Sequence, residues 1–96
     1  MSKVLLEILY ERKSEKFLNK NENKITKDVT RELIIKAVRK LTGKDENIDL
    51  VKMKGEFEGY FRIRKNDLRI VFKVQEDDNR IIITVVNIDF RGNVYK

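Results

Sequence analysis

The sequence predicts an α+β domain, in which an antiparallel sheet of about four strands is covered on one face by two N-terminal helices. Apolar residues recur about every four positions between residues 25 and 41, which is typical of an amphipathic helix. From residue 56 onward the period is two, and β-branched and aromatic residues dominate, which is typical of strands. Because no proline or low-complexity stretch interrupts the 96 residues, we expect a single domain spanning 1–96.

The N-terminal part predicts one strand followed by a short helix. Val4 to Leu9 is an apolar run of strand length. Ser14 is a candidate cap for a short helix carrying Phe17 and Leu18, because its hydroxyl can accept from a backbone N–H of the first turn. The polar stretch 19–24 then predicts a turn.

A second helix over residues 26–42 has the clearest pattern in the chain. Its apolar stripe comprises Ile25, Val29, Leu33, Ala37 and Leu41, with Ile34 and Val38 filling in. Thr26 is the expected N-cap, and Asp28 suits the positive end of the helix dipole. Gly43 is the expected residue just beyond the C-terminal end, where a left-handed conformation is common.

Three strands are expected over 56–65, 68–76 and 80–90, separated by Asn66-Asp67 and by the polar residues before position 80. A two-residue turn at Asn66-Asp67 sorts the first two strands into two consistent faces, whereas a one-residue slip would mix them. The apolar face then pairs Phe61 with Phe72 and Ile63 with Ile70. The other face pairs Arg62 with Val71 and Arg64 with Arg69.

The last strand is apolar on both faces, as expected of a strand inside a sheet. Its even positions are the better core set, namely Ile82, Val86, Ile88 and Phe90. If they face the helices, Arg91 emerges on the face that carries the other arginines. We therefore expect a core formed by Phe61, Ile63, Ile70 and Phe72 beneath the helix bearing Leu33, Ala37 and Leu41.

Composition excludes several function classes. The chain has no cysteine and no histidine, which rules out disulfides, thiolate or imidazole metal sites, serine triads and histidine acid–base pairs. We expect no metal and no cofactor, and a cytoplasmic protein. No apolar run approaches the roughly 18 residues that a membrane span needs, so no membrane partner is expected. The net charge of +6 favours a polyanionic partner, either nucleic acid or an acidic protein.

Arginines on one sheet face form the main candidate site. Residues 52–73 hold seven basic and three acidic side chains, and three of the five basic residues in 60–73 are arginine. Directly opposed like charges destabilise a hairpin, so Arg64 facing Arg69 needs a reason. One interpretation is that the guanidinium groups extend into solvent or pair with Asp67, Asp89 or Glu58. The other is a cradle for phosphate, which arginine binds in bidentate fashion.

Two segments, LVKMKGEFEGYFRIRKNDLRIVFKV (50–74) and IDFRGNVYK (88–96), resemble the core of the RelE/ParE toxin superfamily. That family shows a K-L-K-G stretch, then strands with alternating basic residues, and ends in an H-R-x-x-V-Y motif. The expected order of elements (strand, two helices, three strands) is also similar to the family fold. The resemblance is strongest over the C-terminal half and topological over the rest.

The resemblance implies a RelE-type mRNA interferase, the toxin of a type II toxin–antitoxin system. Such an enzyme is a metal-independent, ribosome-dependent endoribonuclease that cleaves mRNA by attack of the 2′-OH on the adjacent phosphate. The implied partners are a cognate antitoxin, the ribosome and mRNA. The positions that match family site residues are Arg62, Arg64, Arg69, Arg91 and Tyr95. Lys52, Lys54 and Lys65 are the expected additional RNA-binding residues.

The chain departs from the family pattern at two places. Phe90 stands where many relatives have histidine, and arginine stands at both 62 and 64, where well-known bacterial enzymes have lysine. Arginine stabilises a phosphorane but does not readily give up a proton. The candidates for the general base are therefore Lys52, Lys54, Lys65, Glu58 and Tyr95. Two other functions stay open: a ParE-type inhibitor of DNA gyrase without RNase activity, and a non-enzymatic basic module that docks an acidic protein.

Overall fold

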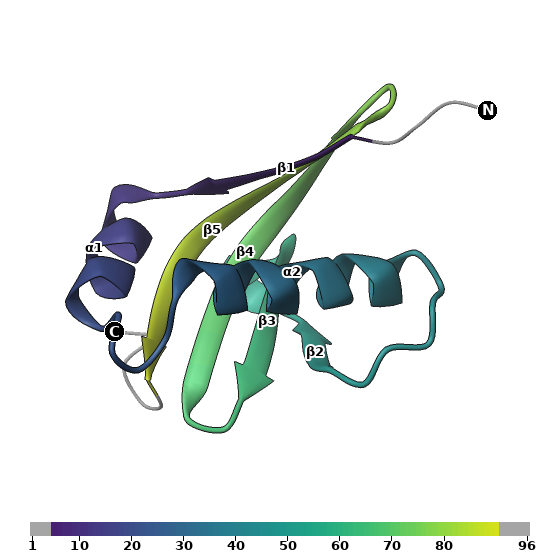
Figure 1. The fold of residues 1–96 in the computed structure, drawn as a ribbon. Coiled ribbons are helices and arrows are strands. Elements are labelled where there is room, and N and C mark those ends of the chain that lie inside the picture. Colours follow the sequence, from purple (N-terminus) through teal and green to yellow (C-terminus); the bar gives the residue numbers. More distant parts are fainter. Residues whose placement is uncertain (1–4, 91–96) are drawn as a thin grey trace.

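The computed structural model describes residues 5–90 and confirms the α+β class. The elements in chain order are β1 (Leu5–Tyr10), α1 (Arg12–Lys20), α2 (Lys27–Leu41), β2 (Asp49–Lys52), a 3₁₀ turn (Gly55–Phe57), β3 (Tyr60–Lys65), β4 (Leu68–Asp77) and β5 (Arg80–Phe90). Helix α2 lies across one face of the sheet, and α1 lies near the end of β1 (Figure 1). Within residues 5–90, no helix is long and apolar enough to cross a membrane.

The sheet has five strands in the order β1-β5-β4-β3-β2. The expectation of about four antiparallel strands is wrong in two respects, because β2 adds an edge strand and β1 runs parallel to β5. A parallel pair requires a long crossover connection, which the two helices and the following hairpins supply here. β2 is only four residues long, so it lacks the extended alternation that identifies a strand in a sequence.

The ends of α2 agree with the sequence prediction, whereas the start of α1 does not. The Thr26 hydroxyl accepts a hydrogen bond from the backbone N–H of Val29 at 3.2 Å, and Gly43 adopts a φ of 94°, so the expected cap and stop of α2 are confirmed. Helix α1 begins after Glu11, and the expected capping role of Ser14 is wrong. Ser14 is buried inside the helix, where its hydroxyl donates to the carbonyl oxygen of Val85 at 3.1 Å and ties α1 to β5.

The β3–β4 hairpin has the expected register. Asn66 adopts a positive φ of 54° in the two-residue turn, a conformation that asparagine tolerates better than most residues. Figure 1 shows the two strands side by side, passing behind α2, with their connecting turn below the helix. The cross-strand pairs are Phe61 with Phe72, Ile63 with Ile70, Arg62 with Val71 and Arg64 with Arg69. This pairing fixes which side chains face the helices and which face away.

The expected core face of β5 is wrong over the first part of the strand, because the strand contains a β-bulge. Val71 pairs with Asn87 while Phe72 pairs with Val85, so Val86 is an extra residue on β5. One extra residue reverses the alternation of side chains. Odd positions therefore face the helices before the bulge, where Ile83 and Val85 are buried, and even positions do so after it, where Ile88 is buried. Ile82 and Val86 were expected in the core and are only partly buried.

The core lies between the sheet and the helices, largely as expected. Ile63, Ile70 and Phe72 are buried together with Leu33 and Ala37 of α2, whereas Phe61 is only partly buried against them. The stripe of α2 is not covered along its whole length: Val29 is 41% exposed and Leu41 is 43% exposed. Leu41 is the last residue of the helix and lines an open groove of about 360 Å³, so only part of its side chain is covered.

Tyr10 at the end of β1 leads to a prediction on alkaline stability. Burial raises the pKa of the Tyr10 hydroxyl; the charge of Arg31 lowers that pKa, and the charge of Asp28 raises it. A raised folded-state pKa stabilises the protein below the unfolded pKa of about 10, and this stabilisation is lost as the pH rises through the folded pKa. We therefore expect that, as the pH rises above about 10, the free energy of unfolding measured in urea falls less in Tyr10→Phe than in the wild type. Equal losses in both proteins would contradict this assignment.

Candidate nucleic-acid interface on the open face of the sheet

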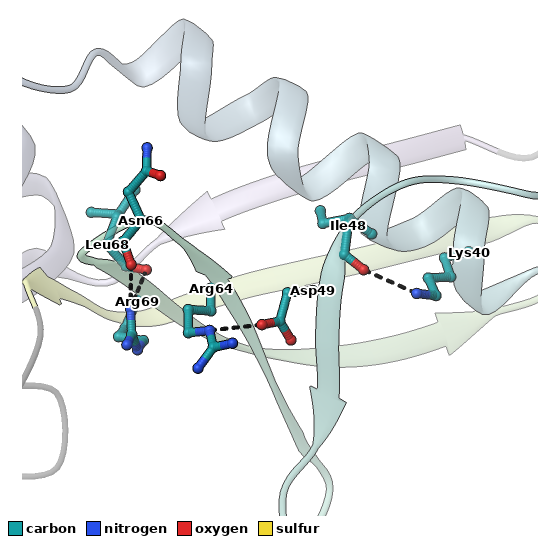
Figure 2. Close-up of polar contacts among 7 residues, drawn as sticks. All are labelled: Lys40, Ile48, Asp49, Arg64, Asn66, Leu68 and Arg69. Carbon is teal, nitrogen blue, oxygen red and sulfur yellow. Dashed lines mark hydrogen bonds and ion pairs between the residues drawn. The ribbon is translucent and has the colours of Figure 1, made fainter.

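Three of the arginines expected in the site lie on the face of the sheet opposite the helices, here called the open face. Arg62 and Arg64 alternate with Phe61 and Ile63 along β3, and Arg69 lies directly opposite Arg64 on β4. Since Phe61 and Ile63 pack into the core, the arginines between them project the other way. Arg64 and Arg69 point away from α2 in Figure 2. Arg91 and Tyr95, the other two expected site residues, lie outside the described residues.

Arg64 forms an ion pair with a residue that the sequence did not indicate. Asp49 lies opposite Arg64 on β2, and its Oδ2 atom is 2.7 Å from Nε of Arg64. Both side chains are partly solvated, with exposures of 52% for Arg64 and 37% for Asp49. The contact is made by the side-on Nε donor; of the two terminal nitrogens of the guanidinium group, one lies on the Asp49 side and the other points away from Asp49 (Figure 2). The sequence suggested Asp67, Asp89 or Glu58 as carboxylate partners of the arginines, whereas the ion-pair partner of Arg64 is Asp49.

Arg69 turns away from Arg64 and binds backbone carbonyls of the hairpin turn. Its Nη1 atom donates to the carbonyl oxygen of Asn66 at 3.0 Å and to that of Leu68 at 3.2 Å (Figure 2). In the register, Asp89 on β5 lies on the other side of Arg69. The two opposed arginines are therefore held by different acceptors, which explains how the like-charge pair is tolerated.

The open face continues from the arginine pair toward the other end of the hairpin. Arg62 is partly buried and lies between Val51 of β2 and Val71 of β4 in the register. Beyond it, Lys73 lies opposite Tyr60, and its side chain is also partly buried. Lys73 thus extends the basic surface to four cations from two adjacent strands, although sequence reasoning did not single it out.

The three lysines expected to bind RNA are not gathered with the arginines. Lys52 lies opposite Phe61 and Lys65 opposite Leu68, so the register places both on the helix face of the sheet. Lys65 lines a groove of about 320 Å³ together with residues of α2. Lys52 and Lys54 line a separate hollow of about 350 Å³ beside the 3₁₀ turn. The open face therefore relies on arginine and Lys73, and Lys52 and Lys65 lie on the other face from the arginines.

The chemistry of this face suits a phosphodiester. Arginine stays protonated at any physiological pH, presents several N–H donors in a fixed plane and matches phosphate oxygens in pairs. Such donors stabilise charge that develops on a phosphate in the transition state. Within residues 5–90, two carboxylates lie beside these arginines: Asp49 forms an ion pair with Arg64, and Asp89 is the register partner of Arg69 on β5.

The fold is similar to those of several solved toxins. The YoeB/ParE toxin from Agrobacterium tumefaciens superposes with a TM-score of 0.64 at 17% identity, over 88% of this chain and 98% of that chain. A copper-bound mutant toxin from Helicobacter pylori gives a TM-score of 0.62 at 19% identity, over 90% of this chain and 94% of that one. The toxin–antitoxin complex RelB–RelE from Methanococcus jannaschii gives a TM-score of 0.51 at 22% identity, over 91% of this chain and 94% of the matched chain. No family model and no curated protein sequence matches the chain.

These superpositions cover nearly the whole chain and nearly the whole of each toxin. They agree with the likeness that the sequence shows over 50–74 and 88–96. The chain therefore has the same fold as these solved toxins, which is the fold that the sequence resemblance implied.

Proposed function

We propose that this RelE/ParE-like chain is the toxin of a type II toxin–antitoxin system, and that it cleaves mRNA on the ribosome in the cytoplasm. The observation that carries the proposal is the set of three arginines, Arg62, Arg64 and Arg69, on the open face of this fold. A fold shared by RNA-cleaving and non-cleaving toxins does not decide the activity, which depends on the residues of the site. Cations gathered on one face favour a phosphodiester substrate over an apolar one.

In the proposed reaction, the 2′-oxygen of the RNA attacks the adjacent phosphorus atom. The 2′-O–P bond forms and the P–O5′ bond breaks, leaving a 2′,3′-cyclic phosphate on one product and a 5′-hydroxyl on the other. A proton leaves the 2′-hydroxyl and another reaches the departing 5′-oxygen. Arg64, Arg62 and Arg69 would hold the nonbridging oxygens and neutralise their growing charge, so that positioning and electrostatics supply most of the rate. Arg91 and Tyr95 would contribute from the C-terminal segment.

Mapping of mRNA ends on ribosomes tests the activity. We expect the purified protein to cut mRNA within ribosome-bound codons during translation, and to leave naked mRNA largely intact. The new 5′ ends should carry hydroxyl groups, as the 2′-OH mechanism requires. Absence of cleavage together with inhibition of DNA supercoiling by gyrase would support the ParE-type alternative. Absence of both effects would support a non-enzymatic docking module.

A cognate antitoxin is the expected regulator. The M. jannaschii RelB–RelE structure and the Staphylococcus aureus YoeB–YefM structure are toxin–antitoxin complexes, and both toxins share this fold. The net charge of +6 favours an antitoxin with an acidic segment that blocks the open face. Such a segment would compete with RNA phosphates for the same guanidinium groups.

Salt dependence of antitoxin binding gives a direct prediction. Because the arginine side chains on the open face are partly solvated, their ion pairs with an antitoxin are screened by salt. We expect the affinity of the toxin for the product of a neighbouring acidic gene to fall as salt is raised, with most of the change in the association rate. Surface plasmon resonance over a series of salt concentrations measures both. A neighbouring protein that neither binds nor restores growth would contradict this part.

A further inference from the structure

The ion pair between Asp49 and Arg64 restricts the orientation of the Arg64 guanidinium group as well as balancing its charge. Asp49 binds the Nε donor of Arg64 at 2.7 Å from the side, on the open face. An arginine has four rotatable side-chain bonds, so an unsupported guanidinium group on a solvated surface samples many orientations. One short, charge-assisted bond at Nε restricts that sampling and leaves one terminal nitrogen directed away from the carboxylate (Figure 2).

The backbone that carries Asp49 is itself fixed from the helix side. Asp49 pairs with Arg64 at the first position of β2. The residue before it, Ile48, accepts a hydrogen bond through its carbonyl oxygen from Nζ of Lys40 at 2.9 Å (Figure 2). Lys40 lies in the last turn of α2, so the end of the helix holds the entry of β2 in place. Asp49 therefore has a defined position relative to Arg64 despite lying on an edge strand.

We propose that Asp49 is a positioning residue, which orients the Arg64 guanidinium group so that the terminal nitrogen directed away from Asp49 meets the scissile phosphate. This inference rests on the proposed function and deepens it. Asp49 acts through Arg64 and does not itself touch the RNA. The negative charge of Asp49 repels the phosphates of RNA, which disfavours a role for Asp49 in binding RNA directly. Orientation of the neighbouring arginine gives this carboxylate a function that its charge alone does not.

The proposal predicts opposite effects on binding and on chemistry. Asp49→Ala removes a negative charge beside the RNA site, so KM for the ribosome–mRNA complex should stay the same or fall. The same change releases Arg64 from its orientation, so kcat should fall by roughly 10- to 100-fold, the scale of misplacing a group in a reacting site. Asp49→Glu, which keeps the charge, should restore part of kcat. The fold should survive, because a partly exposed ion pair contributes little to stability.

Cleavage kinetics on programmed ribosomes with a double-mutant cycle test the dependence on Arg64. We expect Asp49→Ala to slow cleavage in the wild-type background and to have no further effect in the Arg64→Ala background. Asp45→Ala, at an exposed position in the loop before β2, is the matched control and should leave kcat and KM unchanged. Equal, additive losses in both backgrounds would mean that Asp49 acts on its own, for example as a proton acceptor, and would overturn the proposal.

A measurement without activity separates this proposal from the proposed function. Arginine Nε–Hε signals in ¹H–¹⁵N NMR spectra report the order of each guanidinium group. We expect the Arg64 signal to be ordered in the wild type and mobile in Asp49→Ala, while the Arg69 signal is unchanged, because Arg69 is held by turn carbonyls. If Arg64 is equally mobile in both proteins, Asp49 does not position it. If the wild type cleaves no RNA, the proposed function fails, and this measurement alone decides whether Asp49 holds Arg64.

Discussion

Replacing Phe72 by alanine is expected to lower the free energy of unfolding by about 3–5 kcal/mol, a large part of the roughly 5–15 kcal/mol that stabilises a small domain. Phe72 is fully buried in the middle of β4, between Phe61 on β3 and Val85 on β5. Its ring stacks on that of Phe61 with a centroid distance of 5.7 Å. Truncation removes this contact and leaves a cavity beneath α2 that the surrounding strands cannot close.

Urea unfolding followed by circular dichroism measures this loss. Phe57→Ala is the matched control, because Phe57 is a partly exposed phenylalanine in the 3₁₀ turn outside the buried core. We expect the control to lose less than half as much stability as Phe72→Ala. Phe61→Ala should fall between the two, since Phe61 is only partly buried. Similar losses for Phe57→Ala and Phe72→Ala would contradict the placement of Phe72 at the centre of the core.

The parts of the fold that were predictable are those determined by nearby residues. Thr26 and Gly43 mark the ends of α2 because capping and the left-handed stop depend on residues within one helical turn. The β3–β4 register was predictable because the two-residue turn at Asn66-Asp67 leaves one pairing that separates apolar from charged side chains. These features need no knowledge of the rest of the chain.

The parts that were missed depend on distant pairing. β2 exists because Asp49–Lys52 finds the free edge of β3, and four residues carry too little alternation to reveal it. The bulge at Val86 arises where β5 pairs with β4, and the sequence of an apolar strand does not show where one residue is extra. Ser14 was mistaken for a cap because its true acceptor, the carbonyl of Val85, is 71 positions away.

The residues of the candidate site also fall into those that local pairing predicts and those that depend on distant pairing. Arg62, Arg64 and Arg69 could be placed on one face by alternation along a single hairpin. The same pairing put Lys73 opposite Tyr60 on that face, so Lys73 could have been found from the register. Asp49 could not, because its contact with Arg64 requires the register of a strand that the sequence did not predict. Whether Arg91 joins the face lies outside the described residues.

Replacing Arg64 by alanine is expected to lower ribosome-dependent mRNA cleavage by about 10²–10³-fold, the scale of removing a preorganised donor from a transition state. Arg64 lies on the open face near the hairpin turn, opposite Arg69 on β4 and two positions from Arg62 on β3. Its guanidinium group lies on the side of the sheet away from α2 (Figure 2). Because the proposed chemistry relies on neutralising charge at the phosphate, loss of this guanidinium group should reduce kcat more than it raises KM. Arg91→Ala is expected to have an effect of similar size, since the family resemblance places it at the same phosphate.

The loss should be specific to the site and not to the fold. The ion pair of Arg64 is partly exposed, so its removal should change stability by no more than about 1 kcal/mol, and circular dichroism should show a folded variant. Arg12→Ala is the matched control, because Arg12 is an exposed arginine at the start of α1, on the opposite layer of the molecule. It removes the same charge from the whole protein, so any loss caused only by weaker long-range attraction to RNA should appear in both variants. Wild-type cleavage by Arg64→Ala and Arg91→Ala would remove the arginines from the mechanism and leave the open face as a docking surface alone.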